Sequence, residues 1–359
     1  MTNTIFSISL WAVLTTICII LSRVLSAEKW QFIAALPNSK NSDGSYNGTN
    51  LTYYGLFTAN ALLISAAIAL VLLHAIGYNI VLIILTLTLV LIICMPASKI
   101  VAYIVEKRKG TLTIGGAVFT GFIAAPVIVG IVNITAGSAL SSKLELLPFL
   151  AALTAAYAIG EGTGRLACIS FGCCYGKKIE NLSALFHKVL SPFSIKYYGK
   201  TKKIIANGGI EGCATAPIQT ITSLIYISTG AVSTYLFLEQ MFILSFFISL
   251  SITQIWRFLS EFLRDDYRGD GKISAYQLMS LMVIPYYIII ALSYSHEYKN
   301  DISLLEGIAP FKNPITIIAL QILWLAAFIH SGKSTVTSSI ISFKTVKNRQ
   351  KKGNEKKFA

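Results

Sequence analysis

Charged residues are scarce in this chain of 359 residues, of which only 13% are Asp, Glu, Lys or Arg. Soluble domains carry about 25% charged residues, so this chain has too little charge to cover a surface that faces water everywhere. Acidic residues are the scarcer kind, because 16 Asp and Glu stand against 30 Lys and Arg. No nucleic-acid-binding motif accompanies the basic excess, and anionic lipid headgroups are therefore its expected partner.

Histidine and cysteine are also few, and neither is spaced as a metal site. His74, His187, His296 and His330 are dispersed along the chain, and we expect none of them to be catalytic. The six Cys residues include no C-x-x-C pair and no spacing typical of zinc ligands. The sequence therefore predicts neither a metal nor an organic cofactor.

Long apolar runs are abundant, since 54% of the residues are hydrophobic. A helix needs about 20 apolar residues to cross the hydrocarbon core, and a helix satisfies its own backbone hydrogen bonds there. We therefore predict an all-α, polytopic integral membrane bundle. The nine candidate runs are 5–25, 56–75, 78–95, 112–134, 145–170, 216–237, 240–261, 276–295 and 314–332.

The first run has two interpretations. Leu25-Ser26-Ala27 would pass as the small-residue cleavage site of a signal peptide. No Lys or Arg precedes the run, however, and the run is long. These two features favour a membrane anchor that stays in the protein.

The nine runs predict one membrane domain with additions at both ends. We expect an extra helix and a polar loop in 1–51, a core of seven helices in 52–295, an extra helix in 296–332 and a basic, disordered tail in 333–359. Within the core, residues 173–215 are rich in Lys and Tyr. They predict a small polar head on the membrane surface.

Two clusters of charge lie in apolar runs, where a charged side chain costs about 2.5–3.5 kcal/mol near the bilayer centre. Glu161 and Arg165 are four residues apart and share a helix face. Arg257, Glu261 and Arg264 follow at spacings of four and three, which predicts a single stripe. One interpretation is that such charge pairs have no role beyond fixing how the helices pack. Three Arg residues in two clusters favour instead a site for the phosphate of a lipid headgroup.

The stretch from Gly164-Arg165 through Cys168 to Gly172-Cys173-Cys174-Tyr175-Gly176 resembles the signature of the prolipoprotein diacylglyceryl transferase family. Other landmarks of that family follow in the right order over residues 52–295. They are Tyr54-Gly55-Leu56, Lys99 after Ala97-Ser98, Gly115-Gly116, Pro217 with Gln219, the Arg257/Glu261/Arg264 set, and Gln277 with Ser280.

Three positions depart from the family pattern. A His usually precedes the glycine pair and is often regarded as a base, but Ile114 occupies its place here. An Asn and a Glu of the signature are replaced by Cys168 and Cys173. We expect the three neighbouring Cys residues to fill a tight turn, although a redox or covalent role is the alternative.

The resemblance implies transfer of the diacylglyceryl group of phosphatidylglycerol to a cysteine thiol of a lipoprotein precursor, in a bacterial cytoplasmic membrane. It implies catalytic roles for Arg165, Arg257, Glu261 and Tyr54, which we expect to converge on one cavity open to lipid. It also implies a substrate-binding set, which comprises Gly115, Gly116, Arg264, Gly176, Gln219, Lys99 and Glu161.

Two functions of other classes stay open. The missing His favours a lipid-binding or lipid-moving protein without catalysis. Cys173, Cys174 and Cys213 would suit a thiol-redox membrane protein.

Orientation is a conflict within the sequence itself. Threading the runs puts every family landmark, and all Lys and Arg except Lys143, Lys299 and Lys312, at one membrane face. The positive-inside rule predicts that this face is cytoplasmic, whereas the family resemblance predicts that it faces outward. The conflict weakens if the run 314–332 does not fully cross. We favour the outward orientation.

Overall fold

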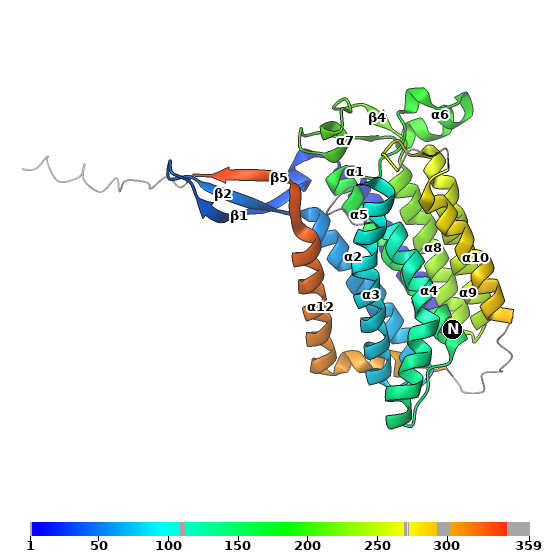
Figure 1. Ribbon diagram of the computed structural model, residues 1–359. Coiled ribbons are helices and arrows are strands. Elements are labelled where there is room, and N and C mark those ends of the chain that lie inside the picture. Colours follow the sequence, from blue (N-terminus) through cyan, green and yellow to red (C-terminus); the bar gives the residue numbers. More distant parts are fainter. Residues whose placement is uncertain (1, 108–112, 269–270, 272, 293–301, 343–359) are drawn as a thin grey trace, which may run out of the picture.

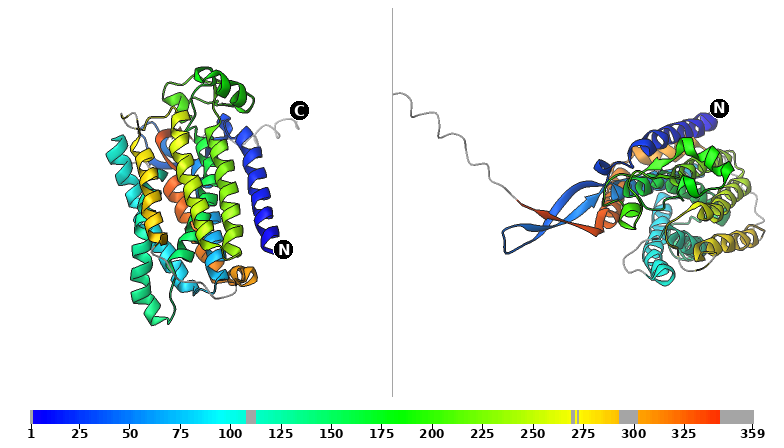
Figure 2. Two further views of the ribbon diagram at one scale, coloured as in Figure 1. Left: turned by 90° about the vertical axis from the view of Figure 1, so that its right-hand side faces the viewer. Right: turned by 90° about the horizontal axis from the view of Figure 1, so that it is seen from above.

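The computed structural model describes residues 2–107, 113–268, 271, 273–292 and 302–342 (Figure 1). Its long helices run side by side in alternating directions (Figure 2). Eight of them are long and apolar enough to cross a membrane, and the apolar part of α10 is shorter. The predicted class is confirmed, and eight of the nine predicted runs are helices of spanning length, whereas the end of the run 276–295 lies outside the described residues. The helices are α1 Thr2–Val24, α2 Tyr53–Ala75, α3 Ile80–Glu106, α4 Ile114–Val132 with a π-turn at Asn133–Gly137, α5 Leu146–Phe171, α8 Ile218–Leu238, α9 Phe242–Ser260, α10 Ala275–Leu292 and α12 Pro314–Gly332.

Helix α5 is the centre of the bundle and packs against α2, α8 and α9. Small residues allow this close packing: a Cβ on Gly162 would lie 3.0 Å from the backbone nitrogen of Ile227 on α8. A Cβ on Gly230 would lie 3.0 Å from the carbonyl oxygen of Ala155 in return. Because α5 is buried, the charges that it carries lie inside the protein.

The additions at the two ends of the chain flank this core. Helix α1 packs on α8, and α12 packs on α2. The short helix α11 (Leu304–Ile308) lies against the far end of α2, where a Cβ on Gly307 would lie 2.5 Å from the carbonyl oxygen of Val71.

A three-stranded sheet projects from the side of the bundle (Figure 1). Strands β1 (Phe32–Lys40) and β2 (Tyr46–Thr52) form a hairpin where a polar loop was expected. Strand β5 (Lys333–Ile341) pairs antiparallel with β2. The tail 333–359 was expected to be disordered, whereas its residues 333–341 form a strand and residues 343–359 lie outside the described part of the chain. The run from Ser334 to Ile341 is rich in β-branched residues, which favour strands.

The head insertion consists of short elements and covers the end of the bundle near which the sheet projects (Figure 1). They are α6 (Ala184–Leu190), α7 (Lys203–Ala206), the two-residue strands β3 (Ile195–Lys196) and β4 (Ala214–Thr215), and 3₁₀ turns at Ile179–Asn181 and Ser191–Phe193.

Lys202 ties this head to the helices beneath it. Its buried Nζ donates hydrogen bonds to the carbonyl oxygens of Leu25 (3.1 Å) and Ser170 (2.5 Å), at the C-terminal ends of α1 and α5. A cation at a helix C-terminus is favourable, because the carbonyl groups there have no partner within the helix. Burial lowers the pKa of Lys202 to about 8, against the opposing influence of Glu28.

Helix α12 crosses the whole bundle and ends at the head side. There Thr52 Oγ1 donates to the carbonyl oxygen of Gly332 (2.9 Å), and β5 continues beside β2. The suggestion that the run 314–332 stops short is therefore wrong. The two ends of the segment that runs from Thr52 to Gly332 therefore lie at the same end of the molecule.

Candidate functional site

The carboxylate of Glu161 is the centre of a buried charge network between α5 and α9. Arg165, one turn further along α5, forms an ion pair with it, as the spacing predicted. From α9, Arg257 Nη2 lies 2.5 Å from both carboxylate oxygens and 3.1 Å from the Tyr157 hydroxyl. Tyr157 in turn donates a hydrogen bond to Glu161. One carboxylate thus holds two guanidinium groups and a phenol.

This network is buried and carries an excess of positive charge. The side chains of Glu161, Arg165 and Arg257 are only 2%, 9% and 11% exposed. Two guanidinium groups against one carboxylate leave one positive charge uncompensated. The buried Nε atoms of Arg165 and Arg257 also have no hydrogen-bond partner within the described part of the chain. Unpaired buried donors and charge are costly, and an anion at this place would satisfy both.

The glycine pair at the start of α4 borders this network. A Cβ on Gly115 would lie 2.9 Å from Tyr276 Cδ1 and 3.3 Å from Arg257 Nη1. Gly115 therefore leaves room for the Arg257 side chain. A Cβ on Gly116 would lie 2.6 Å from Cβ of Val101, so Gly116 serves the packing of α4 on α3.

A second network lies at the head end of α9. The predicted single stripe is wrong, because α9 ends at Ser260, a 3₁₀ turn covers Glu261–Leu263, and Arg264 is extended. Glu261 lies 3.4 Å from Arg264, which also makes two hydrogen bonds of 2.8 Å with Asp266. Arg257 faces the other network instead.

Asp266 and Glu106 belong to this second network, and sequence reasoning missed both. Arg268 donates to Asp266 (3.0 Å) and lies 4.0 Å from Glu106, which accepts a hydrogen bond from Tyr276 (2.9 Å). Burial raises the pKa of Asp266 to about 6, although Arg264 opposes the shift. The i,i+2 spacing of Asp266 from Arg264 in the sequence was the available signal.

The loop after α5 joins the two networks. Gly172 has a φ of +72°, which ends α5, and Gln219 Nε2 fixes the loop by donating to the Cys173 carbonyl (3.0 Å) and to the Tyr197 hydroxyl (2.8 Å). Gly176 pairs with Arg264 through the backbone, and a Cβ there would lie 2.4 Å from the Ala216 carbonyl oxygen. Both predicted binding residues thus shape the loop.

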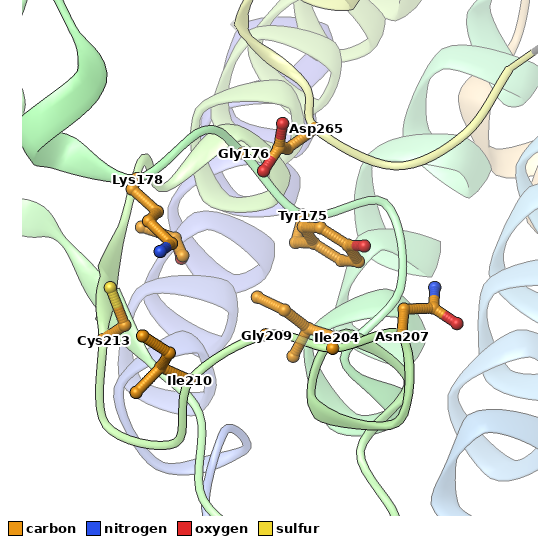
Figure 3. Close-up of a pocket in the computed structure, with 11 residues that line it drawn as sticks. Tyr175, Gly176, Lys178, Ile204, Asn207, Gly209, Ile210, Cys213 and Asp265 are labelled. Atoms are coloured by element: carbon orange, nitrogen blue, oxygen red, sulfur yellow. The ribbon is translucent and has the colours of Figure 1, made fainter.

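Three of the cysteines meet in this loop. The Sγ atoms of Cys168, Cys173 and Cys174 all lie within 4.8 Å of one another. Cys213 is outside this group and lines a pocket of about 210 Å³ in the head, together with Tyr175 and Lys178 (Figure 3). The predicted set of Cys173, Cys174 and Cys213 is therefore not brought together.

The remaining predicted residues lie at different distances from the networks. Tyr54, at the start of α2, packs its ring edge-on against Phe171 (5.6 Å) and interacts electrostatically with Arg165. Lys99 is exposed on α3, and its charge acts on His330 of α12, so it is not part of the buried networks. Ile114 is 39% exposed, and its apolar side chain offers no base.

Comparison with known proteins identifies the family of this chain. The family model described as prolipoprotein diacylglyceryl transferase matches residues 45–293. A protein of Clostridium perfringens (strain 13 / Type A), named phosphatidylglycerol--prolipoprotein diacylglyceryl transferase 2, is 25% identical over 199 residues, which is 51% of this chain and 68% of that relative. No solved structure matches. The chain is a multi-pass membrane transferase that belongs to the prolipoprotein diacylglyceryl transferase family.

Proposed function

We propose that this protein transfers the diacylglyceryl group of phosphatidylglycerol to the cysteine thiol of a lipoprotein precursor. One observation carries the proposal: the pair Arg165 and Arg257 is buried on one carboxylate, with net positive charge and two unpartnered Nε donors. A phosphodiester is an anion that fits such donors. The name of the C. perfringens relative points to the same donor lipid and acceptor.

The chemistry explains why two Arg residues would be needed. The acceptor sulfur attacks the glycerol carbon that carries the phosphate, the C–S bond forms, and the C–O bond breaks. The electron pair of that bond leaves with glycerol phosphate, and the thiol proton is lost. The phosphate thereby gains negative charge as the reaction proceeds. Donors fixed at that place stabilise the transition state more than the bound lipid, which is the condition for catalysis.

The other residues of the proposed site position the Arg side chains or lie beside them. Glu161 holds both guanidinium groups in place, and Tyr157 fixes Glu161. Glu261 and Asp266 hold Arg264 next to the loop of Cys174, where a second phosphate contact or the acceptor peptide can be bound. Tyr54 interacts electrostatically with Arg165, and we assign it a contact with the substrate bound there. We place the protein in a bacterial cytoplasmic membrane, where both substrates occur.

The test is a transfer assay with purified protein, labelled phosphatidylglycerol and a lipobox peptide that contains Cys. We expect a lipidated peptide with the wild type, none with a Cys→Ser peptide, and none with Arg257→Ala. Phosphatidylcholine in place of phosphatidylglycerol controls for the headgroup. A wild type that makes no product under any of these lipids contradicts the proposal.

Ile114 in place of the family His favours the second candidate, a protein that binds the lipid without chemistry. Binding of labelled phosphatidylglycerol that is weakened in Arg165→Ala, combined with no product in the wild type, would establish that function instead.

A further inference from the structure

Cys168, Cys173 and Cys174 come together because the chain reverses sharply after α5. The backbone N–H groups of Gly172 and Cys173 both donate to the carbonyl oxygen of Cys168, at 2.9 and 3.0 Å. Cys174 has a φ of +55°, a left-handed conformation that residues other than glycine seldom adopt. Such strain persists at sites where the surrounding structure requires it. Here its result is that three sulfur atoms meet within 4.8 Å.

The three thiols are buried to different degrees. Cys168 is 2% exposed and Cys173 is 9% exposed, whereas Cys174 is half-buried. Gln219 of α8 donates a hydrogen bond to the Cys173 carbonyl oxygen, which fixes the loop on that helix. Three sulfurs within 4.8 Å of one another supply the number of protein ligands found in catalytic metal sites, which keep a fourth position for an exchangeable ligand.

The charge around the group suits an anionic cluster. Arg268 Nη2 lies 3.6 Å from Cys174 Sγ, and Arg165 and Arg264 interact electrostatically with the same sulfur. Three thiolates and one divalent cation leave a single negative charge. The neighbouring guanidinium groups compensate that charge, and N–H donors to sulfur are the usual second layer around a thiolate-bound metal.

We propose that Cys168, Cys173 and Cys174 bind one thiophilic metal ion, and that Zn²⁺ is the ion that fits this set. Sulfur ligands select zinc or copper(I) over magnesium, calcium or manganese. Zn–S bonds of about 2.3 Å place the sulfurs of a tetrahedral site roughly 3.8 Å apart. The observed group needs to close only slightly to reach that geometry.

The role of this ion rests on the proposed transferase function. A thiol that binds to zinc loses its proton outright, so the acceptor cysteine would become a thiolate when it takes the fourth position. The proton goes to solvent, the sulfur then attacks the lipid carbon, and the C–O electron pair leaves with glycerol phosphate. The product is a thioether, which is a weaker ligand than a thiolate and can leave. No base at Ile114 is needed.

The first experiment measures metal in the purified full-length protein after expression with added zinc and without chelators. We expect about one zinc per chain in the wild type and in the control Cys213→Ser, whose thiol lies outside the group. We expect the double variant Cys168→Ser/Cys174→Ser to lose zinc affinity by at least about tenfold. A wild type that holds no zinc, or a double variant that keeps it, overturns the proposal.

The second experiment uses only the wild type, so it stands even where a cysteine variant does not fold. Zinc is exchanged for Co²⁺, and we expect sulfur-to-cobalt charge-transfer absorption. A lipobox peptide should change the cobalt spectrum, and its Cys→Ser counterpart should not. Absence of the absorption overturns the site. That result is expected if the thiols form disulfides, or if they only pack in the turn and bind no metal. A cobalt spectrum that does not change when the Cys peptide is added overturns the role of the metal in thiol activation.

The transfer assay separates this inference from the proposed function. Full-rate transfer by protein stripped of metal would contradict the role of the metal in thiol activation and leave the transferase proposal standing. A zinc site that responds to the Cys peptide, without transfer from any phospholipid, would leave the site standing and contradict the transferase proposal.

Discussion

Arg257 is the residue whose loss should be felt most at the scale of single side chains, because it joins α9 to the carboxylate of α5. We expect Arg257→Lys to lower kcat/KM by about 100-fold, since a lysine keeps the charge but loses the planar fork that contacts Glu161 and a phosphate together. Lys188→Ala, on the exposed face of α6, is the matched control and should be silent. Steady-state transfer kinetics measure both. Equal kinetics for the Arg257→Lys variant and the wild type would remove Arg257 from the mechanism.

Glu161 should matter for stability as well as for activity. Glu161→Gln keeps the shape but removes the charge that balances two buried guanidinium groups, and breaking a buried pair in this way costs about 3–5 kcal/mol. We therefore expect a lower Tm in detergent and loss of transfer. Glu180→Gln, at an exposed ion pair of the head, is the control and should change neither. A Glu161→Gln protein as stable as the wild type would show that the network is not charged as described.

Sequence reasoning found the half of this site that lies within one helix. The pair Glu161–Arg165 follows from a spacing of four, and the same rule applied in the other direction would have found Tyr157. The family resemblance led us to expect Arg257 near Arg165, but its ion pair with Glu161 depends on how α9 packs on α5, which spacing does not reveal. The three Cys residues were expected in a tight turn, but the closeness of their sulfur atoms was not predicted. That closeness depends on left-handed backbone at Gly172 and Cys174, which ligand spacing does not reveal.

The segment after α9 holds a group that should give the reaction a pH dependence. Burial raises the pKa of Asp266 to about 6 from an ordinary value of 3.8. Its ionised form, which binds Arg264, is therefore lost as the pH falls through about 6. We expect the transfer rate of the wild type to drop there and the rate of Asp266→Asn to be low and flat. A drop that persists in Asp266→Asn would assign the titration to another group.

The same shift has a consequence of opposite sign for stability. Since the pKa is higher in the folded protein, Asp266 contributes stability that is complete below pH 3.8 and is lost as the pH rises through about 6. Asp266→Asn should lack this dependence between those two values.

Lys202 gives a prediction about how the head is fastened to the membrane helices. Lys202→Met should lower stability by about 1–3 kcal/mol, because two helix ends lose a charge-assisted donor. It should also increase proteolysis in residues 173–215. Lys200→Met, at an exposed neighbouring position, should leave both unchanged. Thermal unfolding and limited proteolysis measure the two effects. An unchanged cleavage pattern in Lys202→Met would mean that other contacts hold the head.

Helices and strands differed in how well the sequence predicted them. Within the described residues each apolar run lies in a helix, because crossing a bilayer fixes both length and hydrogen bonding, although α3 continues to Glu106 instead of ending near 95. Strand β5 was missed although Thr335 to Ile341 has the composition of a strand. A strand needs a partner, and its partner β2 lies almost the whole chain away, which no local pattern records.

At the scale of the whole molecule, orientation decides which substrates can reach the site. The head and β5 lie at one end of the bundle, where α5 and α9 also end (Figure 1). Threading of the sequence assigns most Lys and Arg to this same end. Several of these charges serve the fold: Lys202 binds helix ends, and Arg165, Arg257, Arg264 and Arg268 bind acidic side chains. They are therefore weak evidence for a cytoplasmic face, because the positive-inside rule concerns charges in short loops.

We expect the head end to face outward, where translocated precursors expose their cysteine. In a chain whose six native cysteines are replaced by Ser, Lys188→Cys on α6 and Lys143→Cys at the opposite end provide a matched pair of exposed positions. A thiol reagent that cannot cross the membrane should label Lys188→Cys in intact cells, and should label Lys143→Cys only after the cells are opened. The reverse pattern would place the site in the cytoplasm, and the protein could then not modify translocated precursors. The transfer assay with purified protein would still work in that case, so the two experiments together distinguish a wrong orientation from a wrong chemistry.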